Sequence, residues 1–154
     1  MNAGVRESME ASGKALLTLE SVQDGERVQE IYHGEWFRKA RSLYIRYTEA
    51  DGEIRTLIRY SRGELALTRS GAVKMEQTFV DGQRRRGSYR SAMTAFELET
   101  DTTKLSIQGG GAEHDGQGLP ALLPFTLEWK YRLLVEERLS GRFHIRLCIQ
   151  EEHE

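Results

Sequence analysis

One short stretch of the chain places polar side chains, suited to binding chemistry, on a strand face that is otherwise apolar. Residues 65–80 read LALTRSGAVKMEQTFV, and the odd positions are Leu65, Leu67, Arg69, Gly71, Val73, Met75, Gln77 and Phe79. Alternate residues of a strand point to one face, so Arg69 and Gln77 share the side of the leucines. A planar guanidinium can hold a carboxylate or phosphate through two parallel hydrogen bonds. An inward Arg69 is therefore a candidate ligand anchor, with Gln77 beside it.

Three roles are open to Arg69. A buried guanidinium needs a partner, since an unpaired buried charge is costly. It could pair with an inward glutamate or with carbonyls, it could hold a ligand, or a change of face at Gly71 could expose it. A two-residue turn at Ser70-Gly71 would pair residue 69 with 72 and separate Arg69 from Gln77, whereas one long strand bent at Gly71 would keep them together.

Three apolar or aromatic residues are further candidates to line a barrel lumen. They are Met75, Trp129 and Tyr131, the last two in the segment PFTLEWKYRLLVEE (124–137). Each could contact a ligand, or each could simply fill the core. Small barrels do either, so both readings stay open.

A basic cluster adjoins an aromatic ring at Arg84, Arg85, Arg86, Tyr89 and Arg90. Such arginines can contact phosphates while a tyrosine stacks on a base. The alternative is a solvated hairpin tip, and no RNP-like aromatic segment accompanies the cluster. The formal net charge of −2, from 22 basic and 24 acidic residues, also disfavours long-range attraction to nucleic acid or anionic membrane.

Motifs for metal binding or catalysis are missing from the sequence. The four histidines lie apart, at 33, 114, 144 and 153, without metal-ligand spacing. His114 stands between Glu113 and Asp115 in a glycine-rich loop that lacks the Gly-Lys-Ser/Thr ending of a P-loop. No Gly-x-Ser-x-Gly motif occurs, and Cys148 has no nucleophile motif around it. We therefore expect no metal, no cofactor and no catalytic residue, and we lean against an enzyme.

Glycine-based turns divide the chain into short alternating segments. Asp-Gly pairs, which suit hairpin turns, stand at 24–25, 51–52, 81–82 and 115–116. We expect strands at 14–23, 26–37, 41–50, 53–61, 65–80, 86–100, 104–108, 124–137 and 142–152. A helix over 128–141 is the main alternative, but the odd-position apolar residues there fit a strand better. Many short strands with little helix predict an antiparallel sandwich or barrel, and closure removes exposed edges.

Length and composition predict a single domain. The 154 residues suffice for one core, and we expect a flexible segment at 1–13 followed by one barrel domain at 14–154. The single cysteine excludes an intrachain disulfide and favours a reducing compartment. The first residues lack an apolar signal region, and no stretch approaches the about 18 apolar residues of a membrane span. We expect a soluble cytoplasmic protein, either monomer or homodimer, that does not bind membranes.

The run from Arg69 to Val80 resembles the YwiB-like family of small bacterial proteins, which share an Arg-x-Gly-x-Val-x-Met-x-Gln-x-Phe-Val pattern. The likeness extends from about Gly34 to Ile107. It implies an up-and-down antiparallel β-barrel of the calycin type, similar in shape to lipocalins and fatty-acid-binding proteins, and a function that is uncharacterised. Family members often carry a Thr-Pro-aromatic-Gly turn after the tyrosine matching Tyr89, where this chain reads SAMTAF (91–96).

Two functions are consistent with these features. The first is a non-catalytic binder of a small amphipathic or anionic ligand in the lumen, with Arg69 and Gln77 as polar anchors. The alternative is an interaction protein that contacts RNA or an acidic partner through the arginine-rich hairpin at 84–90.

Overall fold

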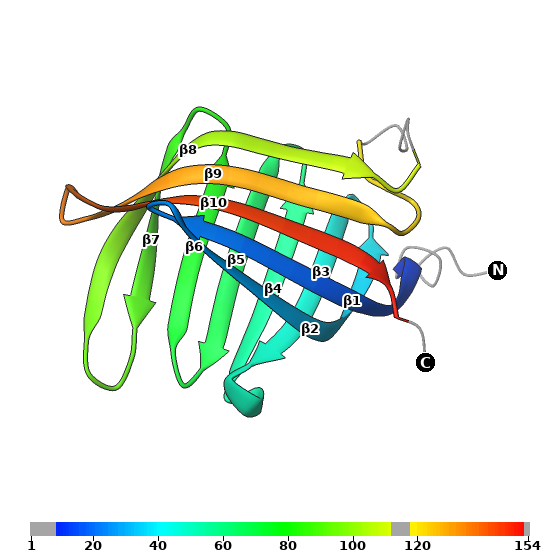
Figure 1. Cartoon of the computed structure of the whole chain (residues 1–154), viewed down its shortest axis with the longest axis horizontal. Helices are drawn as coiled ribbons and strands as arrows, with labels where there is room; N and C mark the ends of the chain where they lie inside the picture. The colour runs from blue at the N-terminus through cyan, green and yellow to red at the C-terminus, as the bar shows by residue number, and fades with distance from the viewer. Residues whose placement is uncertain (1–8, 112–117, 153–154) are drawn as a thin grey trace.

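Ten antiparallel strands form a closed barrel in the computed structural model of the chain, which describes residues 9–111 and 118–152 (Figure 1). The strands are β1 (Met9–Gln23), β2 (Glu26–Lys39), β3 (Ser42–Glu49), β4 (Ile54–Ser61), β5 (Glu64–Gly71), β6 (Lys74–Val80), β7 (Arg84–Arg90), β8 (Ala95–Gly109), β9 (Phe125–Val135) and β10 (Arg138–Glu151). One 3-10 turn, η1 (Ala50–Gly52), joins β3 to β4. No helix in the described ranges is long and apolar enough to cross a membrane.

Each strand pairs with its neighbours in the chain, and β1 pairs with β10 to close the barrel. This confirms the predicted all-β, up-and-down antiparallel barrel. The core consists of the inward residues of the alternating pattern, such as Leu17, Ile45, Leu127 and Leu147, which are fully or almost fully buried. Strand β1 begins at Met9, so part of the predicted flexible segment 1–13 belongs to the barrel.

The stretch 65–80 is a hairpin rather than one long strand. Arg69 of β5 lies opposite Met75 of β6, which centres the turn on Ala72. Neither of the two turn geometries predicted from the sequence occurs. The odd positions of both strands still share one face, because each odd-numbered residue of β5 lies opposite an odd-numbered residue of β6. Gly71 has a φ of +110°, and a Cβ added there would lie 2.2 Å from the Glu53 carbonyl oxygen. The turn therefore requires glycine at this position.

The predicted strand 86–100 is also a hairpin, formed by β7 and the first part of β8. Its turn is held by the Ser91 side chain, whose oxygen accepts hydrogen bonds from the backbone N–H groups of Met93 (3.2 Å) and Thr94 (3.3 Å). The serine side chain thus stabilises this turn, which contains neither proline nor glycine. The predicted strand 104–108 continues β8 beyond a register shift between Thr102 and Lys104.

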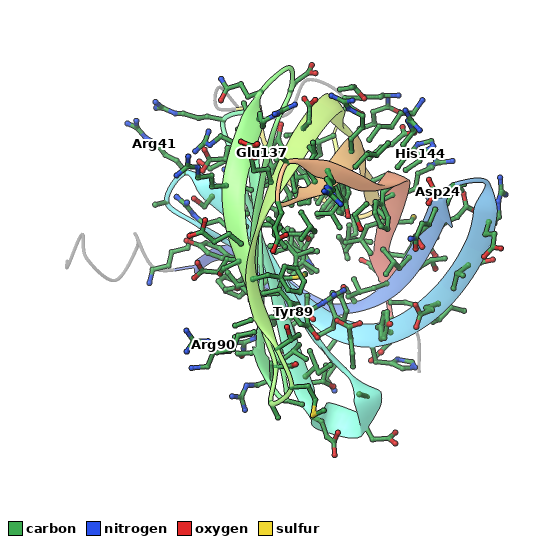
Figure 2. The ribbon with its side chains drawn as sticks, turned by 90° about the vertical axis from the view of Figure 1, so that its left-hand side faces the viewer. Asp24, Arg41, Tyr89, Arg90, Glu137 and His144 are labelled. Atoms are coloured by element: carbon green, nitrogen blue, oxygen red, sulfur yellow. The ribbon has the colours of Figure 1, made fainter. Side chains whose placement is uncertain are left out.

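The seam between β2 and β3 is paired along only part of its length. Residues 35–39 of β2 pair with 42–46 of β3, and the register gives the 26–33 part of β2 no partner other than β1. Gly34 marks the last close approach, since a Cβ there would lie 2.5 Å from the Arg46 carbonyl oxygen. In Figure 2 the blue ribbons of β1 and β2 bow away from the flatter green strands. Over residues 26–33 of β2, the barrel wall therefore lacks backbone pairing between β2 and β3.

Candidate binding site in the barrel lumen

An ion pair stands where the β2–β3 seam loses its pairing. Arg69 Nε donates to Glu49 Oε2 at 3.0 Å, with side chains 30% and 18% exposed respectively. Thr56 of β4, which lies opposite Arg69 in the register, also donates its hydroxyl to Glu49 Oε2. The last residue of β3 and an inward residue of β5 are thereby joined across β4. Arg69 therefore has a carboxylate partner within the protein.

Two buried tyrosines flank the guanidinium. Arg69 hydrogen-bonds the Tyr47 side chain, and burial, reinforced by the Glu49 carboxylate, raises the pKa of Tyr47 although Arg69 opposes the shift. Burial likewise raises the pKa of Tyr131 to about 12, against the lowering effects of Arg69 and of a hydrogen bond with Gln77. Both phenols are therefore neutral at physiological pH and can donate and accept hydrogen bonds.

A cavity of about 200 Å³ is lined both by this polar cluster and by a wall of aromatic side chains. Its lining residues are Leu19, Ser21, Glu30, Tyr47, Glu49, Ile58, Leu67, Arg69, Gln77, Phe79, Trp129, Tyr131, Phe143 and Ile145. Four residues singled out from the sequence, Arg69, Gln77, Trp129 and Tyr131, are among them. The structure thus brings these four side chains to one space.

Met75 does not line this cavity, contrary to expectation. It lies opposite Arg69, close to the β5–β6 turn, and is only partly buried. With Tyr89 it lines a separate hollow beside β7. Met75 packs against the core, but its position along the strand places it outside the lumen cavity.

The aromatic wall is built from rings in mutual contact. Phe79 and Tyr131 have centroids 4.7 Å apart, and Tyr131 stacks on Phe143 at 5.0 Å. Trp129 is 2% exposed, and its indole Nε1 has no hydrogen-bond partner among the described residues. A buried donor without an acceptor costs about 1–3 kcal/mol. The wall therefore combines apolar surface with an unused donor.

Side chains rather than backbone bridge the open part of the seam. The rings of Tyr32 on β2 and Tyr47 on β3 stack with centroids 4.6 Å apart. The Tyr32 hydroxyl donates to Glu30 Oε2 at 2.7 Å and lies 3.5 Å from Glu49 Oε1. Burial, the bond to Glu30 and the Glu49 charge all raise the pKa of Tyr32.

Two acidic residues of this site, Glu30 and Glu49, were not predicted from the sequence. A signal existed for Glu49, because Leu43, Ile45, Tyr47 and Glu49 alternate as Leu65, Leu67 and Arg69 do. No comparable signal marked Glu30, since the first half of β2 is exposed at nearly every position.

Comparison with known proteins places the chain in a family. Residues 17–147 match the family model described as a domain of unknown function (DUF1934). The chain belongs to the DUF1934 family. It is 34% identical over 107 residues to the uncharacterized β-barrel protein YwiB of Bacillus subtilis (strain 168), a match that spans 66% of this chain and 74% of YwiB. The resemblance to YwiB-like proteins seen in the sequence is confirmed.

The fold of this DUF1934 protein has an experimental counterpart. It aligns with the crystal structure of the ywiB protein from Bacillus subtilis with a TM-score of 0.76, over 95% of this chain and 96% of the other. The identity across that alignment is 23%. At this identity the match shows that the two proteins share a fold.

The basic cluster of the DUF1934 protein lies along strand β7, not at a hairpin tip as predicted. Arg84, Arg86 and Arg90 are exposed, whereas Arg85 and Tyr89 are half-buried. Figure 2 shows Tyr89 and Arg90 on opposite sides of the strand. The cluster is therefore divided between two faces.

Acidic residues neutralise part of this cluster. Glu99 and Asp101 of β8 lie opposite Arg86 and Arg84 in the register, and Arg84 approaches Asp101 at 3.8 Å. On the other face, Arg85 contacts Glu64 at 3.3 Å. Tyr89 stacks on Phe96 with centroids 5.0 Å apart, so one face of this ring is already occupied. These contacts weaken the case for RNA binding.

Metal ligands do not gather in the part of the chain that the structure describes, where no group of three or more His, Cys, Asp or Glu side chains is placed to hold an ion. The candidates Glu113, His114 and Asp115 lie outside the described residues. Cys148 is a free, half-buried thiol on β10.

Proposed function

We propose that this DUF1934 protein is a non-catalytic binding protein that holds a small amphipathic molecule in its lumen, as calycin-type barrels do. One observation carries the proposal: the lumen contains a cavity of about 200 Å³ whose lining includes both a polar cluster and aromatic side chains. A barrel of this size can be filled by side chains or can hold a ligand. The cavity supports the second use.

Each part of an amphipathic ligand has a matching surface. An apolar part would contact Phe79, Phe143 and Ile145, where burial in place of water is favourable. A polar part would meet the polar cluster, which contains the Glu49–Arg69 pair and the Gln77 amide. A lining with both polar and apolar side chains favours a ligand that has a polar part and an apolar part.

The size of the cavity restricts the ligand to a small one. Pockets for drug-sized molecules measure about 300–1,000 Å³, whereas this cavity measures about 200 Å³. At a liquid share of about 30 Å³ per water, the space corresponds to roughly seven waters. A single ring with a short side chain fits this limit, and a long fatty acid does not.

From the single free cysteine we also infer that the protein acts in the reducing cytoplasm.

Filling the cavity tests the proposal. Leu67 lines the cavity and is 7% exposed, so Leu67→Phe adds volume inside it. We expect the wild type to bind members of a set of small aromatic and aliphatic amphiphiles in ligand-observed NMR, and Leu67→Phe to lose that binding at least tenfold.

A matched variant controls for general effects on the core. Leu133 is a partly buried residue that packs against the core but does not line the cavity. Leu133→Phe should therefore retain binding, provided that thermal unfolding shows both variants to be folded. Absence of binding to the wild type across the whole set, or undiminished binding to Leu67→Phe, would show that the lumen is not a ligand site.

A further inference from the structure

We propose that the lumen ligand is a small amine whose positively charged group sits at the open β2–β3 seam, between Glu30 and Glu49. This inference rests on the proposed lumen function and specifies its ligand class. The cavity lining contains two carboxylates, Glu30 and Glu49, and one cation, Arg69. Its formal charge is therefore −1, which favours a cation over an anion.

Arg69, the cation that would bind an anionic ligand, is already paired with Glu49. Arg69 donates through Nε to Glu49 at 3.0 Å, so its charge is matched within the protein. A carboxylate placed on the remaining edge of the guanidinium would lie near Glu49, and like charges repel strongly in a partly buried, low-dielectric site. Arg69 was a candidate anchor for an anion, but its pairing with Glu49 makes the binding of an anion unfavourable.

The carboxylates at the seam retain capacity to accept hydrogen bonds. Glu49 Oε2 receives both Arg69 and Thr56, whereas the donor near Oε1 is the Tyr32 hydroxyl, at 3.5 Å. That distance is long for a hydrogen bond between oxygens. Glu30 is exposed on the part of β2 that β3 does not cover, and it receives the Tyr32 hydroxyl on Oε2. An ammonium group, with up to three donors, can satisfy both carboxylates.

Aromatic faces at the same place favour a cation for a second reason. Tyr32 and Tyr47 stack beside these carboxylates, and a cation within about 6 Å of an aromatic face is attracted by the ring quadrupole. Because burial and the neighbouring carboxylates raise the pKa of both phenols, the rings remain neutral and keep hydroxyl oxygens that can accept from an ammonium.

The aromatic part of the lining determines the rest of the ligand. Phe79, Tyr131 and Phe143 present apolar rings, and the cavity volume limits the ligand to about one ring and a short linker. The ligand class is therefore a short arylalkyl or alkyl amine.

Three probes with the same skeleton and different charge test the inference. They are 2-phenylethylamine, 2-phenylethanol and phenylacetate, which carry positive, zero and negative charge at neutral pH. Binding is followed at the indole N–H resonance of Trp129, distinguished from that of Trp36 by the Trp36→Phe variant. We expect the amine to bind at least about fivefold more tightly than the alcohol, and the alcohol more tightly than phenylacetate.

Variants of the seam identify the charge responsible. Glu30→Gln should weaken the amine about threefold and leave the alcohol unchanged, since Glu30 is exposed and a solvated pair contributes modestly. Glu26→Gln is the matched control, because Glu26 is an exposed residue of the same strand face that does not line the cavity. Glu49→Gln should shift preference toward phenylacetate, because Arg69 then lacks its counter-charge.

The outcomes separate this inference from the lumen function. Tightest binding of phenylacetate, or equal binding of amine and alcohol, overturns the amine inference and leaves lumen binding intact. An unchanged amine affinity in Glu30→Gln also overturns it. If none of the three probes binds while other amphiphiles do, the amine class is wrong, and if no amphiphile binds at all, the lumen function falls with it.

Discussion

At the scale of single residues, the Arg69–Glu49 pair makes the fold sensitive to mutation. Both side chains are less than one-third exposed, so removing one leaves the other as a poorly solvated charge. Arg69→Met should lower the free energy of unfolding by about 1–3 kcal/mol. The double variant Arg69→Met with Glu49→Gln should recover part of that loss, because no charge is then left unpaired. Urea unfolding of the two variants measures the difference, and equal losses would contradict the pairing.

A second residue-scale prediction concerns Glu128 on the outer face of β9. A hydrogen bond with His144 is the main cause that lowers the pKa of Glu128 below its ordinary value of 4.5, aided by Lys104 at 3.3 Å. A carboxyl with a lowered folded-state pKa stabilises the fold above its unfolded pKa, and that stability is lost as the pH falls through the folded value. Stability should therefore fall below about pH 4.5, in part through Glu128.

The variant Glu128→Gln tests this pH dependence. It should unfold with a shallower loss of stability between about pH 6 and pH 3, because the residue no longer titrates. Glu137→Gln, in the exposed β9–β10 turn, should keep the wild-type slope. Parallel slopes for wild type and Glu128→Gln in urea titrations would show that the His144 contact does not stabilise the fold.

At the scale of elements, the β5–β6 turn determines whether Arg69 and Gln77 share the lumen. Gly71 has a φ of +110° and lies so close to β4 that a Cβ would be 2.2 Å from the Glu53 carbonyl oxygen. Gly71→Ala should cost about 2–4 kcal/mol of unfolding free energy. Gly63→Ala, at a φ of +77° with nothing within 4 Å, should cost only about 1–2 kcal/mol. Thermal unfolding ranks the two, and an equal effect would rule out the predicted clash with Glu53.

At the scale of the whole molecule, pairing of the first and last strands closes the barrel. Thr18 of β1 lies opposite Cys148 of β10, and both alternate with inward, buried residues, so both point outward. Paired strand residues have Cα separations of about 4.5–5.5 Å, within the range of a disulfide.

The variant Thr18→Cys should therefore form a disulfide with Cys148 and hold the barrel closed. It would join positions far apart in the chain and should stabilise the oxidised protein by about 2–4 kcal/mol relative to the reduced form. Thr18→Cys with Cys148→Ser is the control that cannot form the bond. Thermal unfolding with and without reductant, with mass spectrometry to show the bond, checks the prediction, and an unchanged midpoint would contradict the register.

The sequence alone determined that the protein is all-β and antiparallel, because strand formation depends on local patterns, whereas the choice of a barrel over a sandwich was implied by the family resemblance. Period-two alternation and glycine turns predicted an all-β meander and the inward side of Arg69, Gln77, Trp129 and Tyr131. Local patterns also misplaced some boundaries. The 65–80 and 86–100 segments each contain a turn, at Ala72 and at Ser91–Thr94. The alternation keeps the odd positions on one face through the first turn, but at the second it changes from odd to even positions, since Tyr89 pairs with Phe96.

Only the tertiary structure decided what the inward polar groups contact. Glu49 and Arg69 belong to different strands, and their pairing depends on the register of β3, β4 and β5. The split of the β2–β3 seam beyond Gly34 brings Glu30 and Tyr32 to the same place. The odd or even position of a residue in a strand predicts the face to which its side chain points. Which residues of two strands lie opposite one another depends on the register, which is set when the barrel closes. The charge of the lumen, and hence the ligand class we infer, follows from that closure.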